Sequence, residues 1–224
     1  MKLRSLSYWA LAGLFTLMSG TARADSITIL NPSFEMTNTP STNSGHGPYS
    51  QGVIPDWNVI GSGGWWQPDS SRYSSIPDGS AVAFSNGGSI SQDLGVSLLS
   101  DATYTLSVYV GNRLDNLATT YSFSLMAGST TLCTSGPLGN ALITPGTFVD
   151  ETCTYQSGGT VPGGDLSIVL TSAGAQTNFD NLSLTVNSVP EPGSLVLLGT
   201  GLLFGGLFFI CLKDKRPFQH RSAF

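Results

Sequence analysis

The clearest shortage in this 224-residue sequence is that of positive charge in its long middle part. Between residues 25 and 189 there is no lysine, and Arg72 and Arg113 stand against twelve aspartates and glutamates. The net charge of this part is therefore about −10, although the whole chain carries −5, because the other basic residues lie near its two ends. Such a domain repels nucleic acid and anionic membranes, so we exclude nucleic-acid binding and expect neutral polymers or divalent cations as partners.

Helical patterns and catalytic residue types are also scarce in this part of the chain. Leucine-rich stretches with a 3.6-residue period are missing, and His46 is its only histidine. Neither of its two cysteines lies in a nucleophile motif. Twelve acids could supply the carboxylate pair of a glycosidase, but no pair has an identifying context. We therefore expect no enzymatic activity.

The N-terminus has the three-part layout of a secretory signal peptide. Lys2 and Arg4 precede an apolar stretch over residues 6–18, and Ala22-Arg23-Ala24 fits an A-x-A cleavage site. A membrane helix is the alternative, but this apolar run is too short to span a bilayer comfortably. We assign residues 1–24 to a signal peptide.

A second apolar segment lies near the C-terminus. Residues 195–212 contain no charge, and a basic tail follows over residues 213–224. Eighteen apolar residues approach the length of a membrane span, and positive charge retains the adjoining end in the cytoplasm. A buried core helix would normally keep a polar face. We predict a single transmembrane helix over about 195–212.

The segment before this helix carries Pro190-Glu191-Pro192, a stiff extended stretch that cannot enter a helix. Together with the helix and the basic tail, this motif resembles the PEP-CTERM sorting signal of Gram-negative bacteria that make extracellular polysaccharide. The resemblance covers residues 189–221, and the tail departs from it by running to Phe224 with less arginine. It implies recognition by exosortase, a membrane transpeptidase. We expect the protein to be anchored in the inner membrane before processing and then to reach the cell surface or matrix.

The middle part, residues 25–188, has the pattern of an all-β domain. Many short alternating runs are separated by Gly-rich turns, which is typical of a sandwich or barrel. The runs are residues 26–29, 81–84, 89–94, 103–110, 121–127, 148–155, 166–170 and 178–186. Residues 37–77 are rich in Pro, Gly and Ser, and we predict a long loop there, ordered by its tryptophans.

Five motifs in this part resemble the galactose-binding-like jelly rolls, the fold of many carbohydrate-binding modules. They occur in the same order and at roughly the same spacing as in that family, although each motif alone is weak evidence. The resemblance implies a jelly-roll β-sandwich whose first and last strands lie close together. The motifs are Asn31-Pro32-Ser33-Phe34-Glu35, Ile54-Pro55-Asp56-Trp57, Gly88-Ser89-Ile90-Ser91-Gln92, Thr103-Tyr104-Thr105-Leu106 and Phe179-Asp180-Asn181-Leu182-Ser183-Leu184.

The same resemblance implies that Glu35 and Asp180 help to bind a structural Ca²⁺, with backbone carbonyls completing the shell. Calcium takes six to eight oxygen ligands, which loops of Asp, Asn and Gly supply. Asn181 stands where the family often has a second Asp, which would weaken the site. The alternative is that both carboxylates cap turns without metal.

Aromatic residues gather in the predicted loop. Sugar rings stack their C–H faces on aromatic rings, so we predict that Trp65, Trp66 and Tyr73 contact a polysaccharide. We assign Trp57 to the core. The alternative for the adjacent pair is a partly exposed position without a ligand.

Two cysteines lie in this part of the chain, twenty residues apart. Cys133 and Cys153 each occur in a strand-like stretch of an exported domain, and an oxidising compartment permits a disulfide. We predict a bridge between neighbouring strands, with two buried thiols as the alternative. Cys211 lies inside the predicted membrane helix.

Together these features predict an exported, non-catalytic surface or extracellular-matrix protein with a jelly-roll domain that binds polysaccharide. A purely structural or adhesive matrix protein without a glycan site is the second interpretation. A secreted glycan hydrolase is the third, and it has the least support.

Overall fold

The computed structural model describes residues 24–35, 41–115, 119–188 and 201. The described residues up to Ser188 fall within one compact unit. The predicted signal peptide (except Ala24), the Pro-Glu-Pro motif and the predicted membrane helix (except Gly201) lie outside the described residues. In the part of the chain that is described, no helix has the length and apolar character to cross a membrane.

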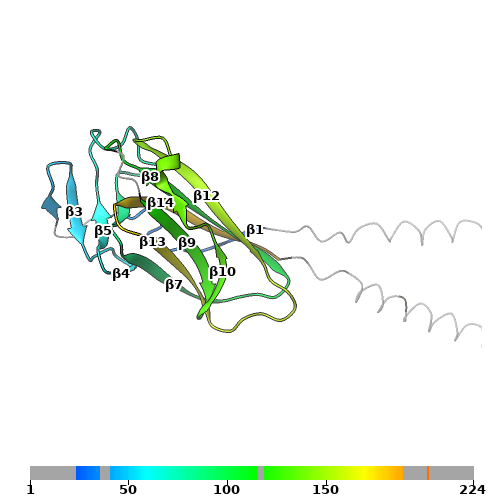
Figure 1. Ribbon diagram of the computed structural model, residues 1–224. Helices are drawn as coiled ribbons and strands as arrows, with labels where there is room; N and C mark the ends of the chain where they lie inside the picture. Colours follow the sequence, from blue (N-terminus) through cyan, green and yellow to red (C-terminus); the bar gives the residue numbers. More distant parts are fainter. Residues whose placement is uncertain (1–23, 36–40, 116–118, 189–200, 202–224) are drawn as a thin grey trace, which may run out of the picture. The chain divides into compact units, whose positions relative to one another are not determined.

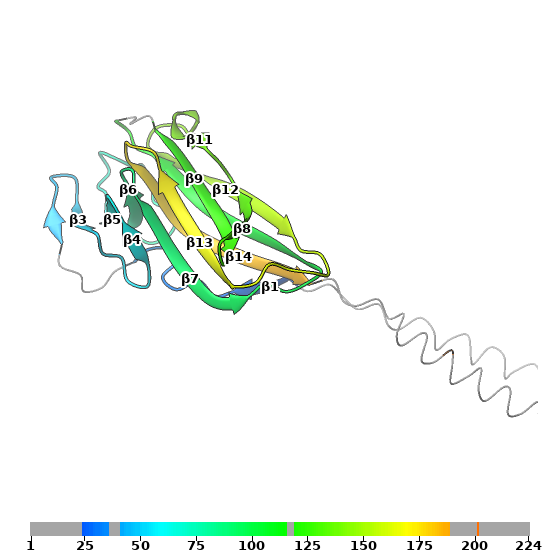
Figure 2. The same cartoon turned by 60° about the horizontal axis from the view of Figure 1, so that its bottom comes forward.

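The described domain is an all-β sandwich of two antiparallel sheets, as predicted (Figures 1 and 2). The larger sheet has the order β12 (Thr147–Gln156), β8 (Ala102–Asn112), β14 (Thr177–Ser188), β6 (Val82–Ser85), β5 (Gly63–Trp66), β3 (Pro48–Gln51) and β2 (Thr42–Asn43), with β1 (Ala24–Ile27) also paired to β14. The smaller sheet has the order β10 (Thr130–Thr134), β9 (Thr120–Ala127), β13 (Asp165–Ser172), β7 (Ser89–Ser97) and β4 (Asn58–Ile60), with β11 (Leu138–Gly139) paired to β9. A short 3-10 helix, η2 (Asn140–Leu142), precedes β12.

The core lies between the sheets and follows from two-residue alternation along the strands. In β8, every second residue from Tyr104 to Val110 is buried, while the residues between them are half-buried on the opposite face. Phe123 in β9 and Leu170 in β13 alternate in the same way and are fully buried. Burying each large apolar side chain stabilises the folded state by about 1.5–3 kcal/mol. The alternation along these strands places such side chains on one face of each sheet, and the two faces pack together as a sandwich.

The first and last strands pair, as the family resemblance implied. Ile27 of β1 lies opposite Leu184 of β14 in an antiparallel ladder. A bulge interrupts the pairing of β14 with β8 between Asp180 and Ser183. Just inside this bulge, the Leu182 amide donates to the carbonyl of Pro32 at 3.0 Å. The segment that follows β1 is therefore held against the closing strand.

The predicted long loop over residues 37–77 is wrong in part, because four short strands occur there, β2 to β5. These strands have two to four residues each. Such lengths are too short to show a two-residue period in the sequence. Trp57 does belong to the core, where its Nε1 donates to the Asn31 carbonyl at 3.1 Å and its ring lies 5.2 Å from that of Phe34.

The predicted disulfide between Cys133 and Cys153 is present, with a Cα–Cα distance of 5.8 Å. The two strands that it joins are in contact but belong to different sheets. Cys133 lies in β10, at the edge of the smaller sheet, and Cys153 lies in β12, at the edge of the larger sheet. The bridge therefore ties the two sheets together along one side of the sandwich.

Loss of this bridge is expected to lower the free energy of unfolding by about 3 kcal/mol, because the linkage restricts the unfolded chain over a loop of about twenty residues. The measurement is urea unfolding of the double variant Cys133→Ala/Cys153→Ala against the oxidised protein. Wild type under dithiothreitol should match the variant. Equal midpoints for all three samples would contradict the prediction.

Candidate functional site

The candidate site is built on the outer face of the larger sheet, where three short strands run side by side. Tyr49 of β3 lies directly opposite Trp66 of β5, and Trp66 lies opposite Val82 of β6. Phe84, two residues beyond Val82, lies on the same face. Trp66, Val82 and Phe84 form a small apolar cluster separate from the main core, and Tyr49 packs against it.

Trp65 and Trp66 are neighbours in β5, so their side chains point to opposite faces of the sheet. Trp65 pairs with Ala83, and both belong to the core between the two sheets. This placement corrects the expectation that the two tryptophans form one exposed platform. That expectation followed from the loop prediction, because only residues of a loop could direct both rings outward.

Tyr73 lies beneath the outer face rather than at its surface, with 3% of its area exposed. Its hydroxyl donates to Asn178 Oδ1 at 2.8 Å, and burial raises the pKa of the phenol well above its usual value. Its ring lies 6.2 Å from Trp66 and 4.6 Å from Phe148. Tyr73 therefore supports Trp66 from below.

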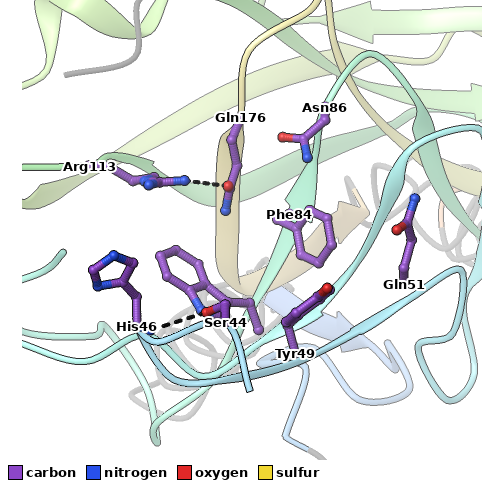
Figure 3. Close-up of a pocket in the computed structure, with 9 residues that line it drawn as sticks. Ser44, His46, Tyr49, Gln51, Phe84, Asn86, Arg113 and Gln176 are labelled. Atoms are coloured by element: carbon purple, nitrogen blue, oxygen red, sulfur yellow. Dashed lines mark hydrogen bonds between the residues drawn. The ribbon is translucent and has the colours of Figure 1, made fainter. Parts of the chain in front are cut away.

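A pocket of about 310 Å³ opens over this aromatic face (Figure 3). Its floor and walls combine three aromatic rings with amide, hydroxyl, imidazole and guanidinium groups. No aspartate or glutamate lines it among the residues that the structure describes. The lining residues are Ser44, His46, Tyr49, Gln51, Trp66, Phe84, Asn86, Arg113 and Gln176.

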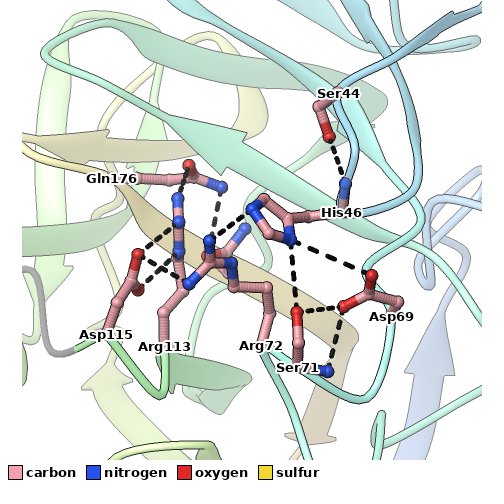
Figure 4. Close-up of polar contacts among 9 residues, drawn as sticks. Ser44, His46, Asp69, Ser71, Arg72, Arg113, Asp115 and Gln176 are labelled. Carbon is pink, nitrogen blue, oxygen red and sulfur yellow. Dashed lines mark hydrogen bonds and ion pairs between the residues drawn. The ribbon is translucent and has the colours of Figure 1, made fainter.

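One wall of the pocket is formed by Arg113, which is fixed by several contacts (Figures 3 and 4). Its Nε and Nη2 donate to the two carboxylate oxygens of Asp115 at 3.0 and 2.6 Å. Its Nη1 donates to Gln176 Oε1 at 2.5 Å. The guanidinium carbon lies 5.2 Å from the Trp66 ring centroid, within cation–π range. These contacts hold the guanidinium in one orientation.

The second arginine of the domain, Arg72, joins the same network behind the pocket (Figure 4). Its Nη1 lies 3.0 Å from Asp115 Oδ2, and its Nη2 lies 2.6 Å from His46 Nε2. Since arginine can only donate, His46 Nε2 accepts and the other ring nitrogen, Nδ1, carries the proton. Two guanidiniums thus share the carboxylate of Asp115.

Ser71 and Asp69 complete the surroundings of His46, without forming a catalytic triad. Ser71 Oγ lies 3.2 Å from His46 Nδ1 and donates to Asp69 Oδ1 at 2.5 Å, and this hydrogen bond lowers the pKa of Asp69. A triad needs the hydroxyl and the carboxylate on different ring nitrogens. Here both face Nδ1, and Arg72 occupies Nε2. The hydroxyl of Ser71 is therefore not activated.

A separate acidic cluster contains the two predicted calcium ligands and one further carboxylate, that of Asp78. Asp180 Oδ2 accepts the Asp78 amide at 3.1 Å. Glu35 Oε1 accepts the amides of Ser80 and Ala81, each at 2.7 Å. The structure therefore brings Glu35 and Asp180 to the two ends of one short turn.

Asp180 is fully buried, and desolvation raises its pKa to about 7, with smaller contributions from the charges of Asp78 and Glu35. Two backbone amides, those of Asp78 and Asn181, oppose the rise. Asn181 has φ of 45° at the bulge of β14. Bulges commonly re-aim a side chain, and this one directs Asp180 toward Asp78.

The sequence patterns missed most of the residues that line the pocket, including Tyr49, Phe84 and Gln176. These come from three segments that pair only in the folded sheet, and none has a local motif. One signal was available: Arg72 and Arg113 are the only arginines of a strongly acidic domain that has no lysine. Such rare charges commonly mark a specific contact, and here both lie in one network.

Two family models match the chain. The model of the HpiC1-like family, described as HpiC1 cyclase, matches residues 25–185, and the PEP-CTERM protein-sorting motif matches residues 188–213. The chain is therefore an exported protein with a PEP-CTERM signal, as predicted. No functionally curated protein matches it.

Solved cyclase structures resemble about three quarters of the chain. A cyclase from Fischerella sp. TAU is 25% identical, with a TM-score of 0.61, and covers 75% of this chain and 100% of its own. The Stig cyclase Fisc from the same organism, in complex with an indole compound, is 24% identical, with a TM-score of 0.62 and the same coverage.

Jelly-roll carbohydrate-binding modules are also among the structural neighbours. The CBM22-1 xylan-binding domain of Paenibacillus barcinonensis Xyn10C is 14% identical, with a TM-score of 0.49, and covers 76% of this chain and 100% of its own. The jelly-roll motifs led to the right fold but not to the cyclase family, which only the family model identifies. The match over residues 25–185 shows that the chain belongs to the HpiC1 cyclase family.

Proposed function

We propose that the domain is a non-catalytic glycan-binding module of a surface or extracellular-matrix protein. The observation that carries this proposal is the composition of the pocket. Three aromatic rings form an apolar surface, amide and hydroxyl groups surround it, and no carboxylate lines it among the described residues. Sugars need such a mixture, because they present flat C–H faces together with a ring of hydroxyl groups.

The electrostatics of the pocket argue for binding rather than for acid–base chemistry. General acid–base catalysis needs a group that can give and take a proton at the ligand. His46 is the only histidine among the lining residues, and its Nε2 is already engaged by Arg72. The carboxylate whose pKa is raised, Asp180, does not line the pocket.

We also propose that Ca²⁺ binds at the acidic cluster, where it would stabilise the fold. Glu35 and Asp180 would hold it, and the charges of Glu35 and Asp78 both act on Asp180. Among the described residues, no three His, Cys, Asp or Glu side chains gather into a metal site by themselves. Carbonyls of the neighbouring turns would therefore have to complete the shell, which suits an oxygen-binding ion such as calcium. A buried carboxylate close to two others fits a bound cation.

Tyr49→Ala is expected to weaken binding of any glycan that the protein recognises by at least about tenfold, because it removes a stacking ring from the pocket. Tyr49 is half-buried on a short strand, so the fold should survive. The assay is a glycan array followed by calorimetric titration of the best ligand. Tyr155→Ala removes a half-buried ring that does not line the pocket and should bind like wild type. Equal losses in both variants would refute the proposed site.

A second candidate function is that of a cyclase acting on an aromatic small molecule, which membership of the HpiC1 cyclase family favours. The pocket volume and its three aromatic rings would also admit an indole-sized compound. Thermal-shift assays with the indole compound bound by the Stig cyclase Fisc and with the array glycans separate the two functions. Stabilisation by the indole compound alone, with product formation by mass spectrometry, would establish the cyclase.

A further inference from the structure

We infer that the pocket selects a glycan that carries a single carboxylate, namely an isolated uronic acid residue within an otherwise neutral chain. This inference rests on the proposed glycan-binding function and adds the chemical class of the ligand. It follows from the position of the few positive charges, the free hydrogen-bond donors of Arg113, the size of the pocket and the charge of the domain.

The positive charges of the domain are concentrated at this pocket. Arg72, Arg113 and His46 are the only basic side chains between residues 25 and 189, and all three belong to one contact network (Figure 4). Arg113 and His46 line the pocket, whereas Asp115 and Asp69 lie outside the lining. A ligand therefore meets a guanidinium on one wall and no carboxylate among the described lining residues.

Arg113 retains hydrogen-bonding capacity toward a ligand. A guanidinium has five N–H donors in one plane. Three of them are used, two for Asp115 and one for Gln176. One donor on each Nη atom is not used in these contacts, and a carboxylate can accept from both Nη atoms of one guanidinium. A neutral sugar would use these donors only for weaker hydroxyl contacts.

The surroundings also hold Arg113 in place before any ligand binds. Trp66 packs against the guanidinium, while Asp115 and Gln176 fix its direction within the plane. A side chain that is already ordered loses little conformational entropy on binding, so more of the contact energy remains as affinity. Asp115 neutralises only part of the charge, because it is shared with Arg72.

The domain as a whole does not suit a dense polyanion. Its net charge is about −10, and a chain with a carboxylate on every residue would bring several charges within the screening distance of about 8 Å at physiological salt. The pocket, at about 310 Å³, lies at the small end of ligand sites. A glycan with one charged residue between neutral sugars limits the repulsion from the acidic domain and needs space for only one charged residue in the pocket.

The test compares three probes in calorimetric titrations of the full-length protein in detergent. They are xylotriose bearing one glucuronic acid, the same oligosaccharide after its carboxyl group is reduced to an alcohol, and tetragalacturonate. At low salt, we expect the singly charged probe to bind at least about tenfold more tightly than its reduced form. Tetragalacturonate should bind no more tightly than the singly charged probe.

Two matched variants locate the effect. Arg113→Gln should lower the affinity for the charged probe about tenfold and leave the reduced probe within about twofold, which also shows that the variant is folded. Tyr155→Ala removes a half-buried ring outside the pocket and should change either affinity by less than about threefold. Equal losses in the two variants would place the effect outside the pocket and would overturn the inference.

The outcomes separate the inference from the function on which it rests. If the charged and reduced probes bind equally well, the selection of a uronic acid is wrong and the glycan-binding function stands. If tetragalacturonate binds best, the pocket does not select an isolated uronic acid within a neutral chain, and the inference is wrong. If no probe binds and the glycan array is also empty, both the proposed function and the inference fail.

Discussion

At about pH 7.5, calcium at about one hundred times its dissociation constant is expected to raise the melting temperature of the protein by about 5–10 °C over the value in a chelator. Ligand binding to the folded state alone contributes about 2.7 kcal/mol at that concentration, and each kcal/mol shifts a domain of this size by about 2–4 °C. About 10 mM calcium reaches this concentration for a site at the tight end of the extracellular range, about 0.1 mM. The physical reason lies in Asp180, which is buried beside two other carboxylates.

The pH dependence of stability in the absence of calcium is a second test of the same acidic cluster. Because the pKa of Asp180 is raised from 3.8 to about 7 in the folded state, the unfolded protein releases this proton first as the pH rises. Between about pH 4 and pH 7 the folded state therefore binds more protons, and stability falls with rising pH, by up to about 4 kcal/mol. Calcium requires the ionised carboxylate, so its stabilising effect should grow over the same range.

The variant Asp180→Asn separates the roles of charge and metal. At about pH 7.5 in chelator it should be more stable than wild type, by on the order of 1–3 kcal/mol, because no charge is buried. It should also lose the calcium response. Asp165→Asn removes an acid outside the cluster and should keep that response. Differential scanning calorimetry measures all these quantities. If calcium leaves the melting temperature of the wild type unchanged, the calcium site is excluded.

The sequence was sufficient to predict the sandwich because its long strands repeat one physical signal. β8 alternates buried and half-buried residues from Ala102 to Val110, and β13 alternates from Leu166 to Ser172. A register slip of one residue would move Leu106 or Leu170 from the core to the opposite face, so the pattern also determines the orientation of each strand. The pairing of β1 with β14 followed from the family resemblance rather than from any pattern.

The pocket could not be predicted in the same way. Tyr49, Phe84 and Gln176 are far apart in the chain, and they come together because β3, β5, β6 and β14 are neighbours in the larger sheet. Short strands of three or four residues do not show their period. The same limitation explains the error at Trp65, whose direction depends on knowing that residues 63–66 form a strand.

The sequence motifs indicated the jelly-roll fold but did not indicate the cyclase family that the domain matches. Jelly rolls that bind carbohydrate and jelly rolls that act as cyclases share the alternating core, and that core dominates the sequence signal. Ligand chemistry instead depends on a few outer-face residues, such as Trp66 and Arg113, which the core pattern does not determine. The contrast between an acidic domain and two clustered arginines is the part of the site that composition could have revealed.

Replacement of Glu191 by Ala is expected to retain most of the protein, at full length, in the membrane fraction. The PEP-CTERM match begins at Ser188, which is also the last residue of β14. Cleavage at the Pro-Glu-Pro motif would therefore remove the apolar segment and the basic tail without cutting any described strand. The acidic domain could then leave the membrane as a folded unit.

This expectation depends on the motif being read by an enzyme. A Pro-Glu-Pro stretch is stiff and adds nothing to the hydrophobic anchoring that residues 195–212 would supply, so its value lies in recognition. Intact mass and cell fractionation in a host with exosortase measure the outcome, and Ser194→Ala, outside the motif, serves as the control. If Glu191→Ala is shortened and released like the control, then the motif is only a spacer. The domain would in that case remain tethered, and its pocket would act on glycans at the outer face of the inner membrane.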